Sequence, residues 1–446
     1  MPHGPLPSFP SGFLWGAATS AHQVEGDNRL NQWWRFEHEP GRIADGSVSG
    51  RACDHWHRFD EDFARAAADS HNAHRLSLEW SRIEPRPGGF DAAAIAHYHD
   101  VFASLRRHAL TPIVTLHHFT DPLWIFDRGG WEDRETIDRF VEFVTFCGRE
   151  FGGEVDWWCT VNEPDVLAFR GWSQGVWPPG KRDDSAALMV MANSIEAHGR
   201  AYRALHQADT IDADGDGHAA QVGFAKHAVI LEPQRPWFAP DVVYRNLEHR
   251  VFNQAVLAAA ATGRIDLWIP GARGVKREVA ELRDSMDYVG INHYTRWKVR
   301  AFARDPHVVP PGTVVNDLGW EIHPSGIETV VRDAAQFGKP VIILENGVAD
   351  ATDRLRPRAL VETLAHLSRA IASGIDVRGY LHWSLLDNFE WAEGYRGRFG
   401  LYQVDFADPA LPRTRTRSAE LFARIARANA IDPALLDEVT TPGYPA

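Results

Sequence analysis

Short apolar runs alternate with longer amphipathic segments along almost the whole chain. The runs contain few polar residues, which is typical of strands buried on both faces of a parallel sheet. We predict eight strands, at Phe13–Thr19, Ala73–Leu78, Ile113–His117, Trp157–Val161, Val222–Ile230, Tyr288–His293, Val341–Leu344 and Tyr380–Leu385.

The segments between these runs have the period of helices. Ile137, Phe140 and Val144 recur at helical spacing with charged residues between them, and Phe59 and Phe63 lie four residues apart beside a run of acids. Alternating strands and helices indicate βαβ units and a parallel sheet. Eight units without a linker predict an α/β fold, a single-domain (β/α)8 TIM barrel over residues 1–446 with elaborated βα loops. A doubly wound open sheet is the alternative, but no G-x-G-x-x-G follows the first strand.

Composition and charge limit the partners of the chain. Of its 446 residues, 44% are hydrophobic and 24% charged, which is typical of a globular protein with a large core. The net charge of −13 argues against nucleic acid or anionic membranes as partners. No run approaches the roughly 20 apolar residues of a membrane helix, and Met1–Pro10 lacks the features of a secretory signal, so we expect a cytoplasmic protein. The sequence leaves open whether the chain forms a homo-oligomer.

We expect neither a metal nor a cofactor. The three cysteines form no C-x-x-C motif, so we predict reduced core residues rather than a disulfide or a zinc site. His117 and His118 are adjacent on a strand and point to opposite faces, so they do not serve one site. Residues 212–217 resemble the start of a calcium loop, but Gly223 occupies the position that requires a glutamate. We interpret this segment as a polar surface turn.

Carboxylates close several of the predicted strands, where active sites form in such barrels. Glu163 follows the fourth strand, Glu345 the seventh and Glu79 the second. A single glutamate in this position suits a solvated loop or a salt bridge equally well. Two on one rim suit glycoside hydrolysis, which needs one protonated and one ionised carboxyl group. Their proximity raises the pKa of one of them and so separates the two roles.

Three segments carry a more specific signal, in order along the chain. They are T-V-N-E-P at 160–164, I-L-E-N-G at 343–347 and W-S-L-L-D-N-F-E-W at 383–391. With them the chain resembles family 1 of the glycoside hydrolases, the β-glucosidase and β-galactosidase family, from Phe13 to about Asp405. The sequence departs from the family pattern at three positions, where the family commonly has Thr, Tyr and Trp: Leu344, His22 and Phe119.

The resemblance implies a retaining mechanism. Glu345 would attack the anomeric carbon, and Glu163 would protonate the leaving group and then deprotonate water. The two carboxyl groups would lie about 5–5.5 Å apart. The implied supporting residues surround this pair: Arg75, Asn162, Asn292 and Tyr294.

Each supporting residue has an implied task. Asn162 would bind the 2-hydroxyl of the sugar. Tyr294, in the segment that begins with Asn292, would hold the nucleophile. Arg75 would keep Glu345 ionised, although a buried salt bridge to another acid is the alternative.

The resemblance also implies the sugar contacts. Gln23, His118 and Trp391 would bind the 3- and 4-hydroxyls, and Glu390 the 4- and 6-hydroxyls. Trp383 would be the aromatic floor; without the motif, a tryptophan in a strand suits the core equally well. The leaving-group side would involve three further tryptophans: Trp33, Trp34 and Trp320.

The expected function is therefore hydrolysis of terminal non-reducing β-D-glucosyl residues from small β-glycosides and oligosaccharides, with galactosyl or fucosyl residues as alternatives. A transglycosidase would use the same intermediate, and the sequence does not separate it from a hydrolase. A non-catalytic sugar-binding relative would most simply have lost one carboxylate, yet Glu163 and Glu345 are both present. A phospho-β-glycosidase is disfavoured because Glu390 would repel a 6-phosphate.

Overall fold

Eight parallel strands close into a barrel, which confirms the predicted (β/α)8 fold. The computed structural model describes residues 6–303 and 305–439. Around the barrel the strands follow the order β1-β2-β3-β4-β5-β9-β12-β13, and β13 pairs with β1 to close it. The barrel strands are β1 (Leu14–Ala18), β2 (Ala73–Ser77), β3 (Thr111–His117), β4 (Trp157–Asn162), β5 (Gln221–His227), β9 (Val289–Asn292), β12 (Val341–Asn346) and β13 (Val377–Trp383).

One predicted strand proves to be two. The apolar run Val222–Ile230 predicts a continuous strand, but β5 ends at His227 and a separate strand, β6 (Ile230–Pro233), begins at Ile230. β6 leaves the barrel and pairs in parallel with β10 (Arg296–Val299). Apolar patterning cannot detect this change of partner, because Ala228 and Val229 continue the apolar run between the two strands.

The barrel is filled by side chains from its own strands. One interior cluster consists of residues that lie on the barrel strands or, for Tyr288, just before β9: Ala73, Ile113, Trp157, Cys159, Ala225, Tyr288, Ile342, Leu344 and Leu381. Such packing is expected of a barrel of eight strands. Cys53, Cys147 and Cys159 are all free and buried, as predicted.

Helices surround the barrel, and they include the two predicted from periodicity, α3 and α7. The α-helices are α1 (Ala21–Val24), α2 (Gln32–Glu37), α3 (His55–Ala68), α4 (Trp80–Ile83), α5 (Ala92–Arg107), α6 (Leu123–Phe126), α7 (Glu135–Phe151), α8 (Pro164–Ala168), α9 (Asp184–Ala208), α10 (Ala239–Glu248), α11 (Ala255–Thr262), α12 (Gly326–Ala335), α13 (Arg356–Ala372), α14 (Arg417–Ala428) and α15 (Ala434–Glu438). Shorter 3-10 or π turns are η1 (Gly130–Glu132), η2 (Phe169–Ser173), η3 (His249–Gln254), η4 (Ala280–Leu282) and η5 (Trp391–Glu393).

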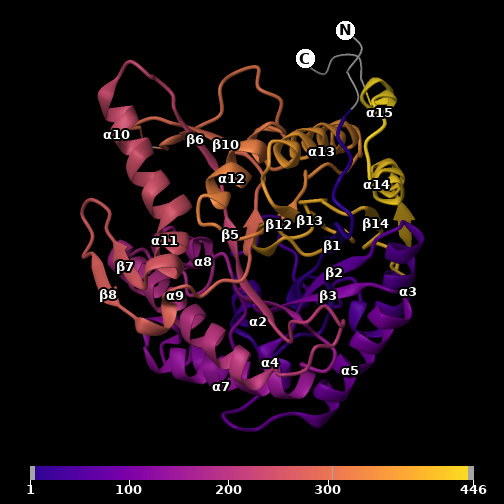
Figure 1. The fold of residues 1–446 in the computed structure, drawn as a ribbon. Coiled ribbons are helices and arrows are strands. Elements are labelled where there is room, and N and C mark those ends of the chain that lie inside the picture. The colour runs from indigo at the N-terminus through magenta and orange to yellow at the C-terminus, as the bar shows by residue number, and fades with distance from the viewer. Residues whose placement is uncertain (1–5, 304, 440–446) are drawn as a thin grey trace.

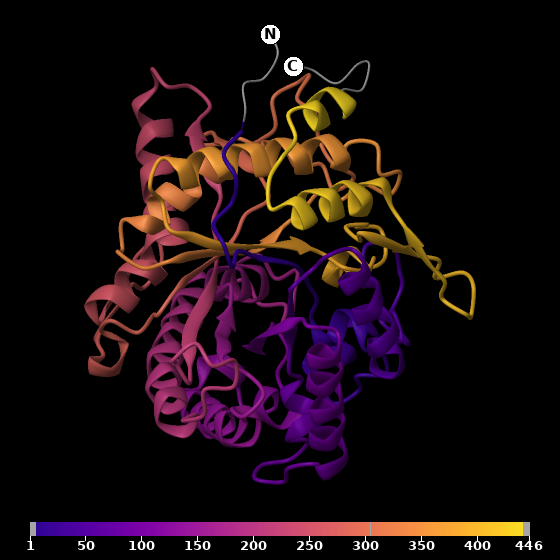
Figure 2. The same ribbon diagram turned by 45° about the vertical axis from the view of Figure 1, so that its right-hand side comes forward.

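Segments from the two ends of the chain lie side by side. α14 and the hairpin β14–β15 (Tyr402–Val404, Arg413–Arg415) lie beside α3 (Figure 1). Arg413 pairs there with Asp62 of α3 at 3.0 Å. In Figure 2, the orange and yellow helices of the last part of the chain lie above the barrel strands and the indigo and purple helices below them.

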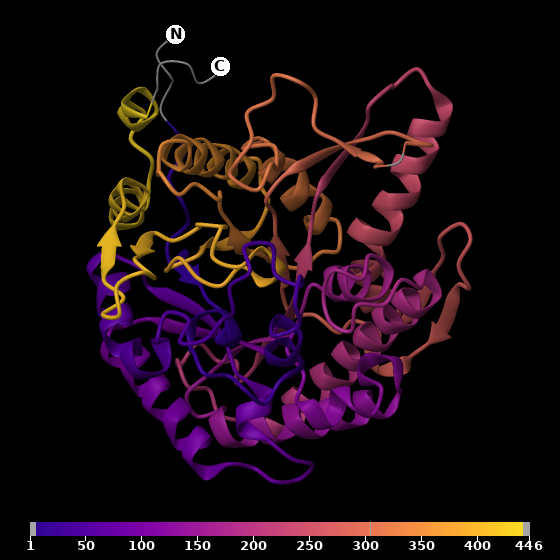
Figure 3. The same cartoon turned by 180° about the vertical axis from the view of Figure 1, so that it is seen from behind.

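The extra strands lie at the periphery. β10 also pairs with β11 (His307–Val308), and together with β6 and α10 they extend from the barrel in Figure 3, as does the hairpin β7–β8 (Arg264–Leu267, Val275–Glu278). Within residues 6–303 and 305–439, none of the helices combines the length and the apolar character needed to cross a bilayer.

Candidate active site

Glu163 lies at the turn between β4 and α8. Its backbone adopts the left-handed conformation (φ 45°, ψ 66°), which is uncommon for a residue other than glycine and occurs often at functional sites. Its N–H donates to the carbonyl of Ala225 on β5 at 2.8 Å, and Pro164 occupies the first helical position. The side chain is only 6% exposed.

Glu345 lies near the end of β12, which β5 and β9 separate from β4 around the barrel. It is 4% exposed. A Cβ on Gly347 would lie 1.9 Å from the carbonyl oxygen of Trp383, so only glycine lets the chain pass β13 at this point. This close approach is a physical reason for the final glycine of the I-L-E-N-G segment.

A continuous set of polar contacts joins the two carboxylates. Arg75, from β2, donates to Oε1 of Glu345 and, at 2.7 Å, to Oδ1 of Asn162. Asn292 donates to the same Oδ1 at 3.1 Å and to Oε1 of Glu163 at 2.8 Å. Arg75 is therefore paired with Glu345 rather than with another acid, and five residues from four strands or strand ends form one hydrogen-bonded network.

The two glutamates differ in electrostatic environment. Burial raises the pKa of Glu163 well above its usual range, and the nearby Glu345 and Asp165 raise it further. Glu345 accepts a second hydrogen bond, at 2.7 Å, from the hydroxyl of Tyr294. Burial and the negative charge of Glu345 raise the pKa of Tyr294, which keeps its hydroxyl protonated as a donor.

Asn162 retains an unused donor. Its Oδ1 accepts from Arg75 and Asn292, whereas its buried Nδ2 has no hydrogen-bond partner among the described residues. Buried polar groups are nearly always satisfied, so this amide is available for a ligand or water.

A second set of polar contacts joins α1 to the loop after β13. Gln23, on α1, is held by Ser20 at 2.6 Å and by Asn388 at 3.0 Å, and it donates to Glu390 at 3.4 Å. Burial and the charge of Glu345 raise the pKa of Glu390 to about 8, against the hydrogen bonds from Trp383 and Gln23. This raised pKa favours the protonated form of the Glu390 carboxyl group in the free protein, so the repulsion of a 6-phosphate expected from the sequence applies to its ionised form.

Aromatic rings line the same region. The ring of His118 stacks parallel to Trp383 and to Trp391, with centroids 5.9 and 6.1 Å away. Burial and the cation of Arg75 lower the pKa of His118 far below its usual value, so its imidazole is neutral. His117, by contrast, faces Asp121 at 2.9 Å, on the opposite face as expected.

The three tryptophans expected on the leaving-group side occupy different positions. Trp320 is half-buried and contacts Tyr294 edge to face at 5.9 Å. Trp33 is buried against Trp391 at 4.7 Å, and the partly exposed Trp34 packs on His38. Tyr294 in turn donates a hydrogen bond to Glu345. The contact of Trp320 with Tyr294 therefore leads to one of the two glutamates.

Several residues that position the site were not anticipated from the sequence. Thr115 accepts from Nε of Arg75 at 2.9 Å, and Ser20 and Asn388 orient Gln23. These small polar residues carry no pattern of their own. Asp165 and Lys226, a buried ion pair beside Glu163, did have a signal, because a lysine interrupts the apolar run of β5.

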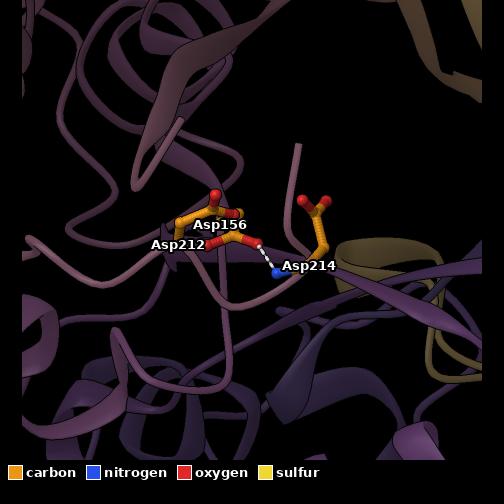
Figure 4. A group of neighbouring side chains, drawn as sticks. All are labelled: Asp156, Asp212 and Asp214. Atoms are coloured by element: carbon orange, nitrogen blue, oxygen red, sulfur yellow. Dashed lines mark hydrogen bonds between the residues drawn. The ribbon is translucent and has the colours of Figure 1, made fainter. Parts of the chain in front are cut away.

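The acidic segment 212–217 lies at the opposite end of β4 and forms a polar surface turn. Asp212 accepts from the N–H groups of Gly215 and Gly217 at 2.7 and 2.9 Å. Asp156, just before β4, accepts from the N–H of Asp214 at 2.7 Å (Figure 4). Carboxylate oxygens of the three aspartates lie within 4.8 Å of one another. The N–H of Ala213 donates to the other oxygen of Asp156 at 2.9 Å. Backbone N–H groups therefore satisfy both oxygens of Asp156.

Comparisons with known proteins agree with this geometry. The family model described as "Glycosyl hydrolase family 1" matches residues 6–431. The β-glucosidase A of Thermotoga maritima is 33% identical, covering 90% of this chain and 94% of that protein. The β-galactosidase of Pyrococcus woesei is 29% identical, covering 97% and 99%. The structure of a β-glycosidase from Pyrococcus horikoshii superimposes with a TM-score of 0.88 at 32% identity, covering 99% of each chain. This chain belongs to glycosyl hydrolase family 1 and is a glycoside hydrolase.

Proposed function

We propose that the chain of 446 residues acts as one catalytic domain that removes terminal β-D-glucosyl or β-D-galactosyl residues with retention of configuration. The observation that carries the proposal is the unequal environment of two buried glutamates that one hydrogen-bonded network connects. Glu345 lies between a cation, Arg75, and the donor Tyr294. Glu163 lies among acids and has its pKa raised by burial. This difference favours one ionised and one protonated carboxyl group.

The first displacement uses both forms. A carboxylate oxygen of Glu345 bonds to the anomeric carbon while the bond from that carbon to the aglycone oxygen breaks. Glu163 gives its proton to the departing oxygen, so the leaving group departs neutral. Arg75 and Tyr294 release Glu345 as its charge is consumed in the covalent intermediate.

The second displacement reverses the roles. Glu163 is now ionised and takes a proton from water, whose oxygen bonds to the anomeric carbon as the ester to Glu345 breaks. Two inversions give net retention, which requires carboxyl groups about 5–5.5 Å apart. Loss of the negative charge on Glu345 in the intermediate also lowers the proton affinity of Glu163, which suits its release of the first proton.

Groups around the pair are suited to a sugar. The free Nδ2 of Asn162 can donate to the 2-hydroxyl beside the anomeric carbon. Gln23 and the protonated Glu390 can exchange hydrogen bonds with hydroxyls farther along the ring, and Trp383 offers an apolar face. The relatives named β-glucosidase and β-galactosidase support a glucosyl or galactosyl ring.

The stereochemical outcome tests this proposal. Proton NMR of the first-formed sugar from p-nitrophenyl β-glucoside should show the β-anomer before mutarotation. A first-formed α-anomer would exclude the retaining mechanism. A panel of aryl β-glucosides, β-galactosides and β-fucosides, compared by kcat/KM, identifies the preferred glycone.

A further inference from the structure

A buried ion pair, Asp165–Lys226, includes a residue close to Glu163 along the chain. Nζ of Lys226, on β5, lies 3.1 Å from Oδ2 of Asp165, the second residue after Glu163, and both side chains are fully buried. Lys226 also donates to the carbonyl of His227. The other oxygen of Asp165 has no hydrogen-bond partner among the described residues, and Nδ1 of His227 lies 3.5 Å from Oδ2.

Lys226 points away from the interior of the barrel. Ala225 belongs to the cluster inside the barrel, so the next residue, Lys226, points outward. There it borders a cavity of about 280 Å³ between the strands and helices, together with Leu257 and Val330. Among the described residues, no side-chain hydrogen bond joins Asp165 or Lys226 to Glu163, Glu345 or Asn162.

Two contacts attach the chain around Glu163 to β5. The N–H of Glu163 is bonded to Ala225 on β5, and Asp165 binds the next residue of β5, Lys226. The start of α8 is thus attached to β5 on both sides of the left-handed residue. Such a backbone conformation persists only where its surroundings hold it.

We propose that Asp165 and Lys226 are a positioning pair, which fixes Glu163 against β5 so that its carboxyl group can act as the proton donor. The inference rests on the proposed acid/base role of Glu163. Burying a charged pair is costly, and replacing such pairs by apolar residues is often neutral or stabilising, so stability alone does not explain its presence.

The charges around Glu163 give the direction of the effect. After burial itself, Glu345 of β12 raises the pKa of Glu163 most and Asp165 of α8 next; Asn292 of β9 and Lys226 of β5 lower it. Asp165 therefore outweighs Lys226, and the pair as a whole favours the protonated acid. Arg75 of β2 contacts Glu345 and Asn162 rather than Glu163.

The test is the alkaline limb of the pH profile of kcat/KM in the variant Asp165→Asn. We expect this limb to move to lower pH by roughly half to one unit. The direction holds whether the unpaired Lys226 keeps its proton or loses it, because Asp165 has the larger influence. At pH well below the limb, activity should approach that of the wild type. At alkaline pH, glycosides with poor leaving groups should lose more rate than activated aryl glycosides.

Two further variants make the result decisive. Asp62→Asn removes one member of another fully buried pair, Asp62–Arg413, on the outer helix α3, and should leave the limb in place. If Asp165→Asn does not fold, the double variant D165N/K226M leaves no unpaired buried charge and should shift the limb in the same direction. Circular dichroism checks folding in each case.

An alkaline limb that stays at the wild-type pH in a folded Asp165 variant would overturn the inference. The proposed function fails differently. If Glu163→Ala retains the same alkaline limb, then Glu163 is not the acid, whatever Asp165 does.

Discussion

The ends of β4 and β12 present the same residue type in the same place, with different surroundings. Each strand delivers a buried glutamate to the rim, 6% exposed in one case and 4% in the other. Glu345 meets the cation of Arg75, whereas Glu163 meets an amide, from Asn292, and two acids. The strand end places each carboxyl group, and residues from other strands decide its chemistry.

The end of β2 provides a third case. Glu79 is fully buried, and its oxygens accept from Asn28 at 2.6 Å, Ser81 at 2.6 Å and Thr120 at 3.0 Å. Both of its carboxylate oxygens are used within the protein, so this glutamate holds loops together. Both oxygens of Glu345 are also hydrogen-bonded, but one of its donors is the cation of Arg75, whereas the donors to Glu79 are uncharged side chains.

Removal of the proposed nucleophile should have the largest effect. We expect Glu345→Ala to lower kcat on p-nitrophenyl β-glucoside by about 10⁴-fold or more, because the proposed covalent intermediate forms on its carboxylate. Steady-state assays at substrate saturation measure this loss. A variant that kept near-normal kcat would place the nucleophile elsewhere.

Removal of the acid should have a smaller effect that depends on the substrate. For Glu163→Ala we expect a loss of about 10²- to 10⁴-fold in kcat/KM for alkyl glycosides, which need protonation of the leaving oxygen. Dinitrophenyl glycosides leave without a proton and should lose far less. An equal loss of kcat/KM for substrates whose leaving groups differ in pKa would contradict the acid role of Glu163. The glutamates at the ends of β4 and β12 would then not differ in the way proposed.

Glu79→Gln should have the smallest effect on catalysis. We expect kcat/KM to stay within about tenfold of the wild type, while the free energy of unfolding falls by about 1–3 kcal/mol because an amide NH₂ faces donors in place of an acceptor. Thermal or urea unfolding followed by circular dichroism measures the change. A loss of turnover as large as that of Glu163→Ala, without a loss of stability, would bring Glu79 into the chemistry.

Local patterns in the sequence were enough to predict the barrel and its rim. Apolar runs located the eight barrel strands, and carboxylates at strand ends indicated the rim. Contacts between distant segments could not be predicted in this way. The pairing of β6 with β10, and of Asp165 with Lys226, depends on segments 61 or more residues apart. Neither contact has a local sequence pattern, except that Lys226 interrupts the apolar run of β5.

The central claim is that Glu345 forms a bond to the sugar, and a slow substrate tests this directly. A 2-deoxy-2-fluoro-β-glucoside with a dinitrophenyl leaving group forms the intermediate faster than water releases it. After proteolysis, mass spectrometry should find one fluoroglucosyl group on the peptide that contains Glu345, and none on that containing Glu163. A label on Glu163, or inactivation without any label on Glu345, would contradict the assignment of the two strand ends.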